Sequence, residues 1–144
     1  LQEEVILDIL RDNRDEKSIA AEEIETYDRQ GGYTLLANSA AIHPDRPDLL
    51  RRILEEICNF WIGQYPERYI RKIYTQTVSH TGDRLAQKFF MSPRLDLAYN
   101  AFELDLSRPA ASRIVEVFQK RMKSKAPLPL DLQSRYPEED RRRN

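Results

Sequence analysis

The chain has 144 residues, of which 40% are hydrophobic and 33% are charged, and its formal net charge is -1. This length suits one domain with a single hydrophobic core. The near-neutral charge excludes a strongly basic polyanion binder, and no apolar run approaches the roughly 20 residues of a membrane span. The single cysteine, Cys58, excludes a disulfide within the chain, which fits a reducing compartment such as the cytoplasm.

Two helices are predicted within the first 30 residues. Residues 3–12 carry apolar side chains at helical spacing, and residues 15–29 carry a thinner apolar stripe. Gly31 and Gly32 are expected to end the second helix, because glycine readily adopts the left-handed conformation found at helix ends. We therefore expect a helical N-terminal segment over residues 1–30.

Residues 33–42 form a strand-sized run of apolar and small side chains that ends at the His43–Pro44 corner. Continuous apolar character is typical of a strand that is buried on both faces. A short buried helix is the alternative, because Leu35, Leu36 and the nearby alanines are good helix formers. The glycine pair before the run and the His-Pro pair after it favour the strand.

Residues 47–62 are predicted to form an amphipathic helix. Asp45 is expected to cap it, Pro47 suits its first turn and Gly63 is expected to end it. The apolar stripe expected to face the core consists of Leu49, Leu50, Ile53, Leu54, Ile57, Cys58 and Trp61. The outer face is expected to carry Arg51, Arg52, Glu55 and Glu56.

The rest of the chain continues the alternation of strands and helices. Strands are predicted over 70–79 and 99–106, and helices over 82–90 and 109–123. Ser79 or Thr81 is expected to cap the first of these helices, Ser92–Pro93 to close it, and Ser107 to cap the second. We therefore predict an α/β (α+β) domain over residues 1–124, with a mixed central sheet and flanking helices. Residues 125–144 are proline-rich and charged, and they predict an extended or disordered tail.

Residues 33–106 resemble the second half of the GCN5-related N-acetyltransferase (GNAT) superfamily, as a divergent or partial member. The segments that carry the resemblance are YTLLANSAAIHP, PDLLRRILEEI, IRKIYTQTVS, TGDRLAQKFFMSP and YNAFELDL. The resemblance implies a central strand that runs into a helix whose N-terminus holds the pyrophosphate of coenzyme A. It also implies a second strand that splays from the first. The loop HPDRPDLLRR departs from the family pattern, which usually has glycines at this place.

By this resemblance the cofactor is acetyl-CoA or another acyl-CoA, bound at the strand–helix corner 43–52. The candidate cofactor-binding residues at that corner are Arg46, Leu49, Arg51 and Arg52. The helix dipole and the arginines attract phosphate, whereas Asp45 and Asp48 repel it. The implied activity is N-acyl transfer, in a form that is either active or degenerate.

Acyl transfer to an amine needs a general base and a general acid. The predicted central strand contains no glutamate, so His43 at its end is the candidate base, because imidazole titrates near neutral pH. Tyr74 and Tyr99 are the candidate acids by residue type. The alternatives are a surface imidazole in a His-Pro turn and tyrosines that pack on the sheet.

Two other functions are compatible with the sequence. The first is a non-catalytic protein-interaction or dimerisation module. It would bind a protein partner, or a second copy in a homo-oligomer, through the N-terminal helices or the C-terminal tail. Nucleic-acid contact would use residues 65–74, where basic and tyrosine residues alternate, but the overall neutrality disfavours it. We expect no metal site, because Cys58, His43 and His80 lack the close spacing of metal ligands. Cys58 lies on an apolar stripe and is expected to be a core thiol.

Overall fold

The computed structural model describes residues 1–38, 45–46 and 48–124, and these form an α+β fold around a mixed sheet. The order of the strands is β1-β2-β4-β3. Strand β1 (Gly31–Ala37) pairs in parallel with β2 (Arg68–Gln76) along the whole length of β1. Strand β4 (Ala101–Asp105) is antiparallel both to β2 and to the two-residue strand β3 (Ser92–Pro93). The predicted fold class is therefore confirmed.

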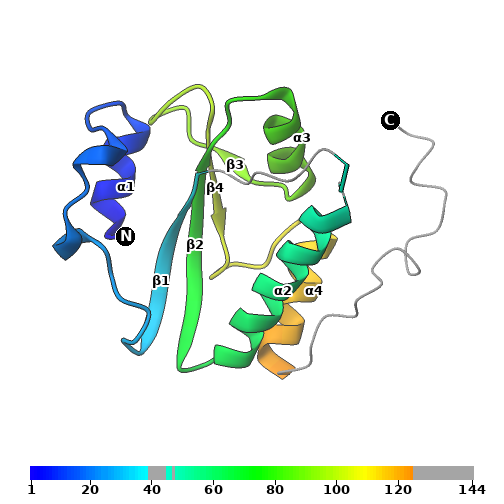
Figure 1. The fold of residues 1–144 in the computed structure, drawn as a ribbon. Coiled ribbons are helices and arrows are strands. Elements are labelled where there is room, and N and C mark those ends of the chain that lie inside the picture. The colour runs from blue at the N-terminus through cyan, green and yellow to red at the C-terminus, as the bar shows by residue number, and fades with distance from the viewer. Residues whose placement is uncertain (39–44, 47, 125–144) are drawn as a thin grey trace.

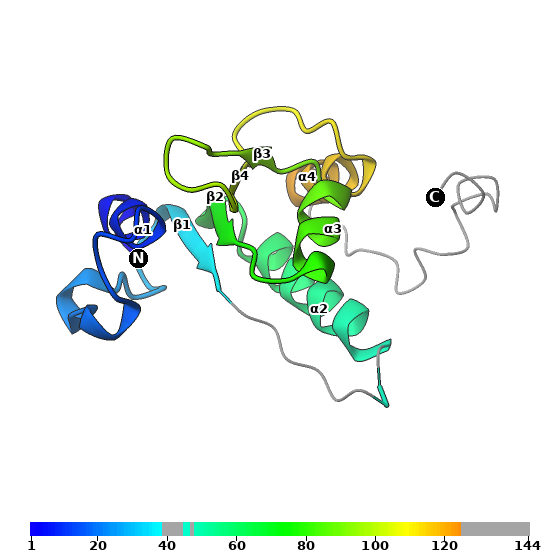
Figure 2. The same ribbon diagram turned by 90° about the horizontal axis from the view of Figure 1, so that it is seen from above.

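Helices cover both faces of the sheet (Figures 1 and 2). Helix α1 (Glu3–Leu10) lies on one face, while α2 (Asp48–Gln64), α3 (His80–Lys88) and α4 (Arg113–Ser124) lie on the other side. Successive strand residues point to opposite faces, and each face builds its own apolar cluster. The cluster beneath α1 contains Ile6, Leu10, Tyr74, Leu97 and Ala101. The cluster beneath α2 and α4 contains Tyr33, Ile62, Ile70, Leu106, Val115, Phe118 and Met122.

The predicted helix over 15–29 is wrong. The chain instead makes two short 3₁₀ turns, η1 (Glu16–Ser18) and η2 (Ala21–Glu23). Side chains hold these turns, because the Asp15 carboxylate accepts the Lys17 amide at 2.7 Å and Glu23 accepts the Ala20 amide at 2.8 Å. Such local bonds compete with a continuous helix. The glycine pair begins β1 rather than ending a helix, and Gly31 has a positive φ of 117° that suits glycine alone.

The remaining elements lie where the sequence predicts them, with shifted ends. The strand predicted over 33–42 is confirmed as far as Ala37, and residues 39–44 lie outside the described residues. Ser79 caps α3, because its hydroxyl accepts the Gly82 amide at 3.1 Å. Ser107 does not cap α4, since its amide donates to Asp105 at 2.9 Å and α4 begins only at Arg113.

Three smaller predictions about element ends also fail. Gly63 continues α2 instead of ending it. Ser92–Pro93 forms β3 instead of closing a helix. Strand β2 ends at Gln76, three residues before the predicted end at 79. No helix within 1–38 or 48–124 is long and apolar enough to cross a lipid bilayer.

Candidate functional site

The amino end of α2 is the corner where the sequence places a cofactor. Arg46 is exposed, and its guanidinium pairs with the carboxylate of Asp48 at 2.9 Å. This pair lowers the pKa of Asp48, chiefly through the hydrogen bonds from Arg46. The half-buried Leu49 donates its amide to the Arg46 carbonyl at 3.1 Å. His43, the candidate base, lies outside the described residues.

A shallow charged depression of about 350 Å³ lies on one side of α2. It is lined by Asp48, Arg51, Arg52, Glu55 and Glu56. Arg51 donates to the buried carboxylate of Glu55 at 2.9 Å, so this guanidinium is already paired. Three carboxylates therefore face two guanidinium groups, and an anion that binds here has to compete with carboxylates for the arginines.

Tyr74, one candidate acid, lies on the opposite face of the sheet, in the apolar cluster under α1. It is fully buried, and its hydroxyl donates to the Glu3 carboxylate at 2.7 Å. Burial raises the pKa of Tyr74, and the bond to Glu3 raises it further. The hydroxyl is thus held by Glu3 and points to no open surface.

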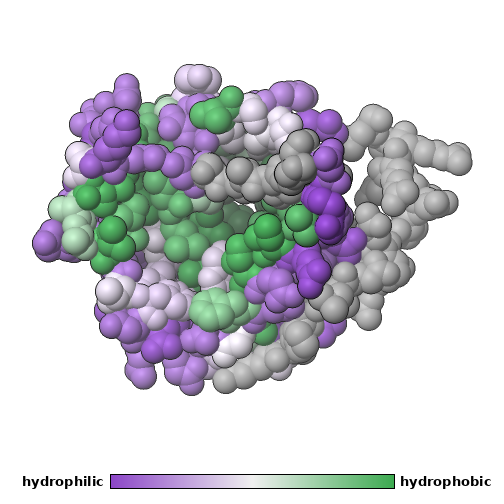
Figure 3. Space-filling model, in the orientation of Figure 1, coloured by the Kyte–Doolittle hydropathy of each residue, from purple (hydrophilic) through white to green (hydrophobic). Residues whose placement is uncertain are grey.

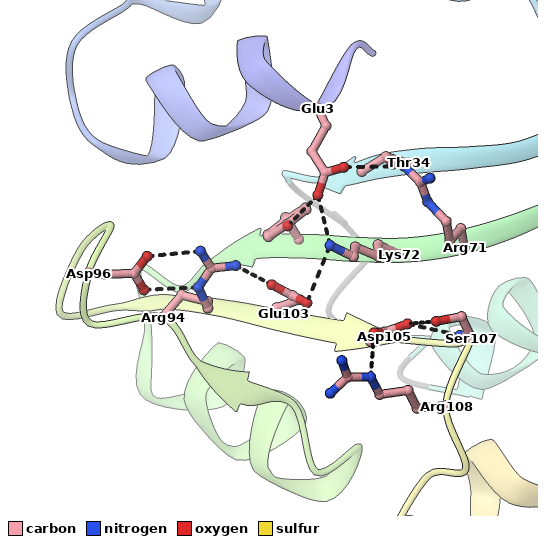
Figure 4. A network of polar contacts seen from close by, with 11 residues as sticks. Glu3, Thr34, Arg71, Lys72, Arg94, Asp96, Glu103, Asp105, Ser107 and Arg108 are labelled. Carbon is pink, nitrogen blue, oxygen red and sulfur yellow. Dashed lines mark hydrogen bonds and ion pairs between the residues drawn. The ribbon is translucent and has the colours of Figure 1, made fainter.

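Glu3 also fixes α1 to the sheet (Figure 4). Its carboxylate accepts from Lys72 at 2.9 Å and from Arg71 at 3.2 Å. Burial acts to raise the pKa of Glu3, but the bonds from Lys72 and Tyr74 outweigh it and the pKa is lowered. Because Lys72 lies 3.9 Å from Glu103 of β4, charged groups from α1, β2 and β4 form one structural network.

Tyr99, the other candidate acid, lies at a third place. It is almost fully exposed beside a pocket of about 470 Å³. The residues that line this pocket are Thr77, Val78, Ser79, His80, Asp83, Tyr99, Asn100 and Phe102. Asn100 and Asp83 are bonded to Thr77, so they hold the loop in shape. The candidates in the described ranges therefore lie at three separate places, and their catalytic roles stay predictions.

The rotation of α2 differs from the sequence-based expectation and creates an unexpected surface. Ile62, absent from the predicted stripe, is only 2% exposed in the core, and Glu55, predicted to face outward, is buried. In a helix of 3.6 residues per turn, the nine residues from Ile53 to Ile62 make two and a half turns, so these two side chains point in opposite directions. Three large apolar side chains consequently face outward: Ile53 (47% exposed), Ile57 (39%) and Phe60 (54%).

We call Ile53, Ile57 and Phe60 the α2 apolar face. Figure 3 shows apolar surface on α2 beside a hollow that separates it from β1. Phe60 lies near Tyr27, with 5.9 Å between the ring centroids, and Ile24 is exposed in the same N-terminal segment as Tyr27. Large exposed apolar patches on a protein surface commonly mark sites of interaction with other molecules.

Among the described residues, no other strand pairs with the outer edge of β1, although Arg29 donates to the Gly32 carbonyl at 3.3 Å. Strand β1 is the end strand, and its seven residues include no charged side chain and no proline. Native edge strands commonly carry lysine or proline, which discourage pairing with other chains. An uncharged edge next to an exposed apolar helix face is typical of a surface that another polypeptide covers.

The basic and aromatic residues of 65–74 are engaged within the fold. Arg71 and Lys72 bind Glu3, and Arg68 donates to the Asp28 carbonyl at 3.2 Å. Tyr65 and Tyr69 pack edge to face, with 6.0 Å between their ring centroids. This segment therefore forms part of the sheet and its salt bridges, which leaves fewer groups to contact nucleic acid.

Comparisons with family models, curated proteins and solved structures found no match for this chain. Among the residues described, no three or more His, Cys, Asp or Glu side chains gather in a way that holds a metal ion. Cys58 lies against the core, and burial raises the pKa of its thiol to about 11, as expected of a core thiol rather than a nucleophile.

Sequence reasoning missed the α2 apolar face and the Glu3 network. A signal for the first exists, since Ile53, Ile57 and Phe60 follow steps of four and three residues that form a stripe of their own. The second has no local signal, because Glu3 and Tyr74 are 71 residues apart in the chain.

Proposed function

We propose that this chain is a non-catalytic protein-interaction module that binds an extended apolar polypeptide segment on the α2 apolar face. The observation that carries the proposal is the outward rotation of α2, which exposes Ile53, Ile57 and Phe60 while it buries Glu55. A helix that packs only against its own domain is expected to bury its isoleucines and to expose its glutamates. The cytoplasm is the proposed location, because the chain has a single cysteine and this cysteine is a free, partly buried thiol.

The binding surface is suited to an extended segment for two reasons. The α2 apolar face is a narrow stripe, about 10 Å from Ile53 to Phe60 at 1.5 Å per residue. No described strand pairs with the outer edge of β1, so a strand-like partner could pair with the part of this edge beyond Gly32, whose carbonyl accepts from Arg29. The polar rim, which includes Arg52 and Glu56, keeps the surface soluble when it is unoccupied.

Ile57→Gln tests this function with the full chain. Fluorescent peptides that carry leucine at alternate positions should bind, and Ile57→Gln should weaken binding at least about tenfold, because loss of a central anchor residue costs about 2 kcal/mol or more. Fluorescence anisotropy measures the affinity. Glu56→Gln, on an exposed neighbouring side chain, is the matched control and should change affinity by less than about twofold. Equal affinities of the two variants would remove the proposal, as would absent peptide binding by a full-length chain in which Leu128, Leu130 and Leu132 are replaced with aspartate.

As a second candidate, we propose a GNAT-like domain that binds acyl-CoA at the amino end of α2. One observation favours it. Helix α2 connects two parallel strands, so it runs back along them and its amino end lies toward the carboxyl end of β1. A helix amino end offers amide groups and positive dipole character to phosphate. Ligands of open α/β sheets commonly bind at that position.

Isothermal titration of the full chain with acetyl-CoA tests this candidate. We expect measurable heat that weakens in Arg52→Ala, because Arg52 is an exposed cation beside the first turn of α2. Lys123→Ala, in the last turn of α4, removes the same charge elsewhere and serves as the control. Absence of heat at millimolar coenzyme, or equal loss in both variants, would remove the candidate.

A further inference from the structure

In the described part of the chain no element covers the α2 apolar face, whereas the apolar face of α1 is covered by the sheet. Helix α1 buries Val5, Ile6, Ile9 and Leu10 against the sheet. Helix α2 leaves Ile53, Ile57 and Phe60 between 39% and 54% exposed. Exposing these three large apolar side chains to water costs free energy, roughly 25 cal/mol for each Å² of apolar surface. Something that covers this stripe would therefore bind with a favourable hydrophobic contribution.

The described chain ends close to this face. Helices α2 and α4 lie side by side and run in the same direction (Figure 1). Phe118 of α4 packs on Trp61 with 6.3 Å between ring centroids, and Met122 in the last turn of α4 shares a cluster with Ile62. Ser124, the last described residue, therefore lies near the carboxyl end of α2, the end at which Phe60 lies.

Twenty residues, 125–144, follow this point, and their first part has a spacing that fits the face. Leucines occupy the alternate positions 128, 130 and 132. In an extended chain such positions point to one side, about 6.6 Å apart. A four-residue step along a helix, as from Ile53 to Ile57, is about 6 Å. The three leucines would span about 13 Å, compared with about 10 Å from Ile53 to Phe60, so each leucine can meet one side chain of the stripe.

Two further features of this segment favour an extended, docked state. Pro127 and Pro129 alternate with the leucines, and proline restricts φ to values found in extended chains, which lowers the entropy lost on docking. Four residues from Ser124 to Leu128 reach about 13 Å when extended, and four more to Leu132 about as far again. Asp131 falls on the side away from the leucines, where it stays hydrated.

We propose that residues 128–132 of this chain are the occupant of the α2 apolar face. They lie extended and antiparallel to α2, with the leucine side chains against Phe60, Ile57 and Ile53. This inference rests on the proposed function, because it names which apolar segment the face binds. It implies that the tail competes with any other segment for the same surface.

A spin label placed in the full chain at Gln133→Cys tests the proposal. Cys58 is only partly buried, so the labelled chain also carries Cys58→Ala, which leaves Gln133→Cys as its single thiol. We expect the methyl signals of Ile53 and Ile57 to be strongly broadened by the label, and those of Ile6 on the other side of the sheet to be unchanged. Replacing Leu128, Leu130 and Leu132 together with aspartate should restore the Ile53 and Ile57 signals, and Asp131→Asn should not.

A mixed sample identifies the source of any broadening. One chain carries the spin label and no isotope, and a second chain carries isotope-labelled methyl groups and no spin label. Broadening in this mixture would show that a second copy supplies the tail and would overturn the proposal, as would unbroadened Ile53 and Ile57 signals in the single-chain experiment. If leucine peptides still bind the face in that case, the proposed function stands while this inference falls.

Discussion

Ile6→Ala should lower the free energy of unfolding by about 2–5 kcal/mol, the usual range for removing a buried isoleucine side chain. Ile6 is 0% exposed and lies in the cluster with Leu10, Tyr74, Leu97 and Ala101. The loss combines the lost burial with a cavity between α1 and the sheet, which the network at Glu3 prevents from collapsing freely. Urea unfolding followed by circular dichroism measures it.

The control for this effect is Ile24→Ala, in the same N-terminal region. Ile24 is 55% exposed, so we expect a change within about 0.5 kcal/mol. If both alanine variants shift the urea midpoint equally, α1 does not pack on the sheet. The contrast between a closed α1 face and an open α2 face would then be lost, and with it the reason to assign binding to α2.

The sequence predicts the domain well wherever one local period decides the structure. The helix at 47–62 and the strands at 70–79 and 99–106 are found because their apolar patterns and end signals agree. The helix predicted at 15–29 fails, because its apolar stripe is thin and Asp15 and Glu23 bond the backbone into short turns.

The candidate site is predictable only by residue type, since its geometry depends on tertiary contacts. Helix α2 carries two overlapping apolar stripes, one through Ile53 and Ile57 and one through Trp61 and Ile62. Its own periodicity does not decide which of them docks. The contacts of Ile62 and Trp61 with the β1, β2 and α4 cluster decide it. In the same way, only the packing of α1 reveals that Tyr74 is bonded to Glu3.

The rotation of α2 predicts opposite outcomes for one charge placed at two positions. Ile62→Asp should cost at least about 4 kcal/mol, because a carboxylate at a position 2% exposed would be buried without a partner. Ile57→Asp should cost less than about 1 kcal/mol, because that side chain already meets water. Urea midpoints measure both, and Ile62→Val, expected to cost about 0.5–1.5 kcal/mol, gives a graded value if Ile62→Asp does not fold.

A reversed order, with Ile57→Asp the more damaging change, would mean that α2 faces the core through the stripe expected from its sequence. Ile53 and Ile57 would then be buried, and neither a leucine peptide nor residues 128–132 would have a surface to bind. The expected order, with Ile62→Asp the more damaging change, would instead establish that Ile53 and Ile57 are not needed in the core. In that case selection for folding does not account for them, and binding supplies the physical reason for large apolar side chains at these positions.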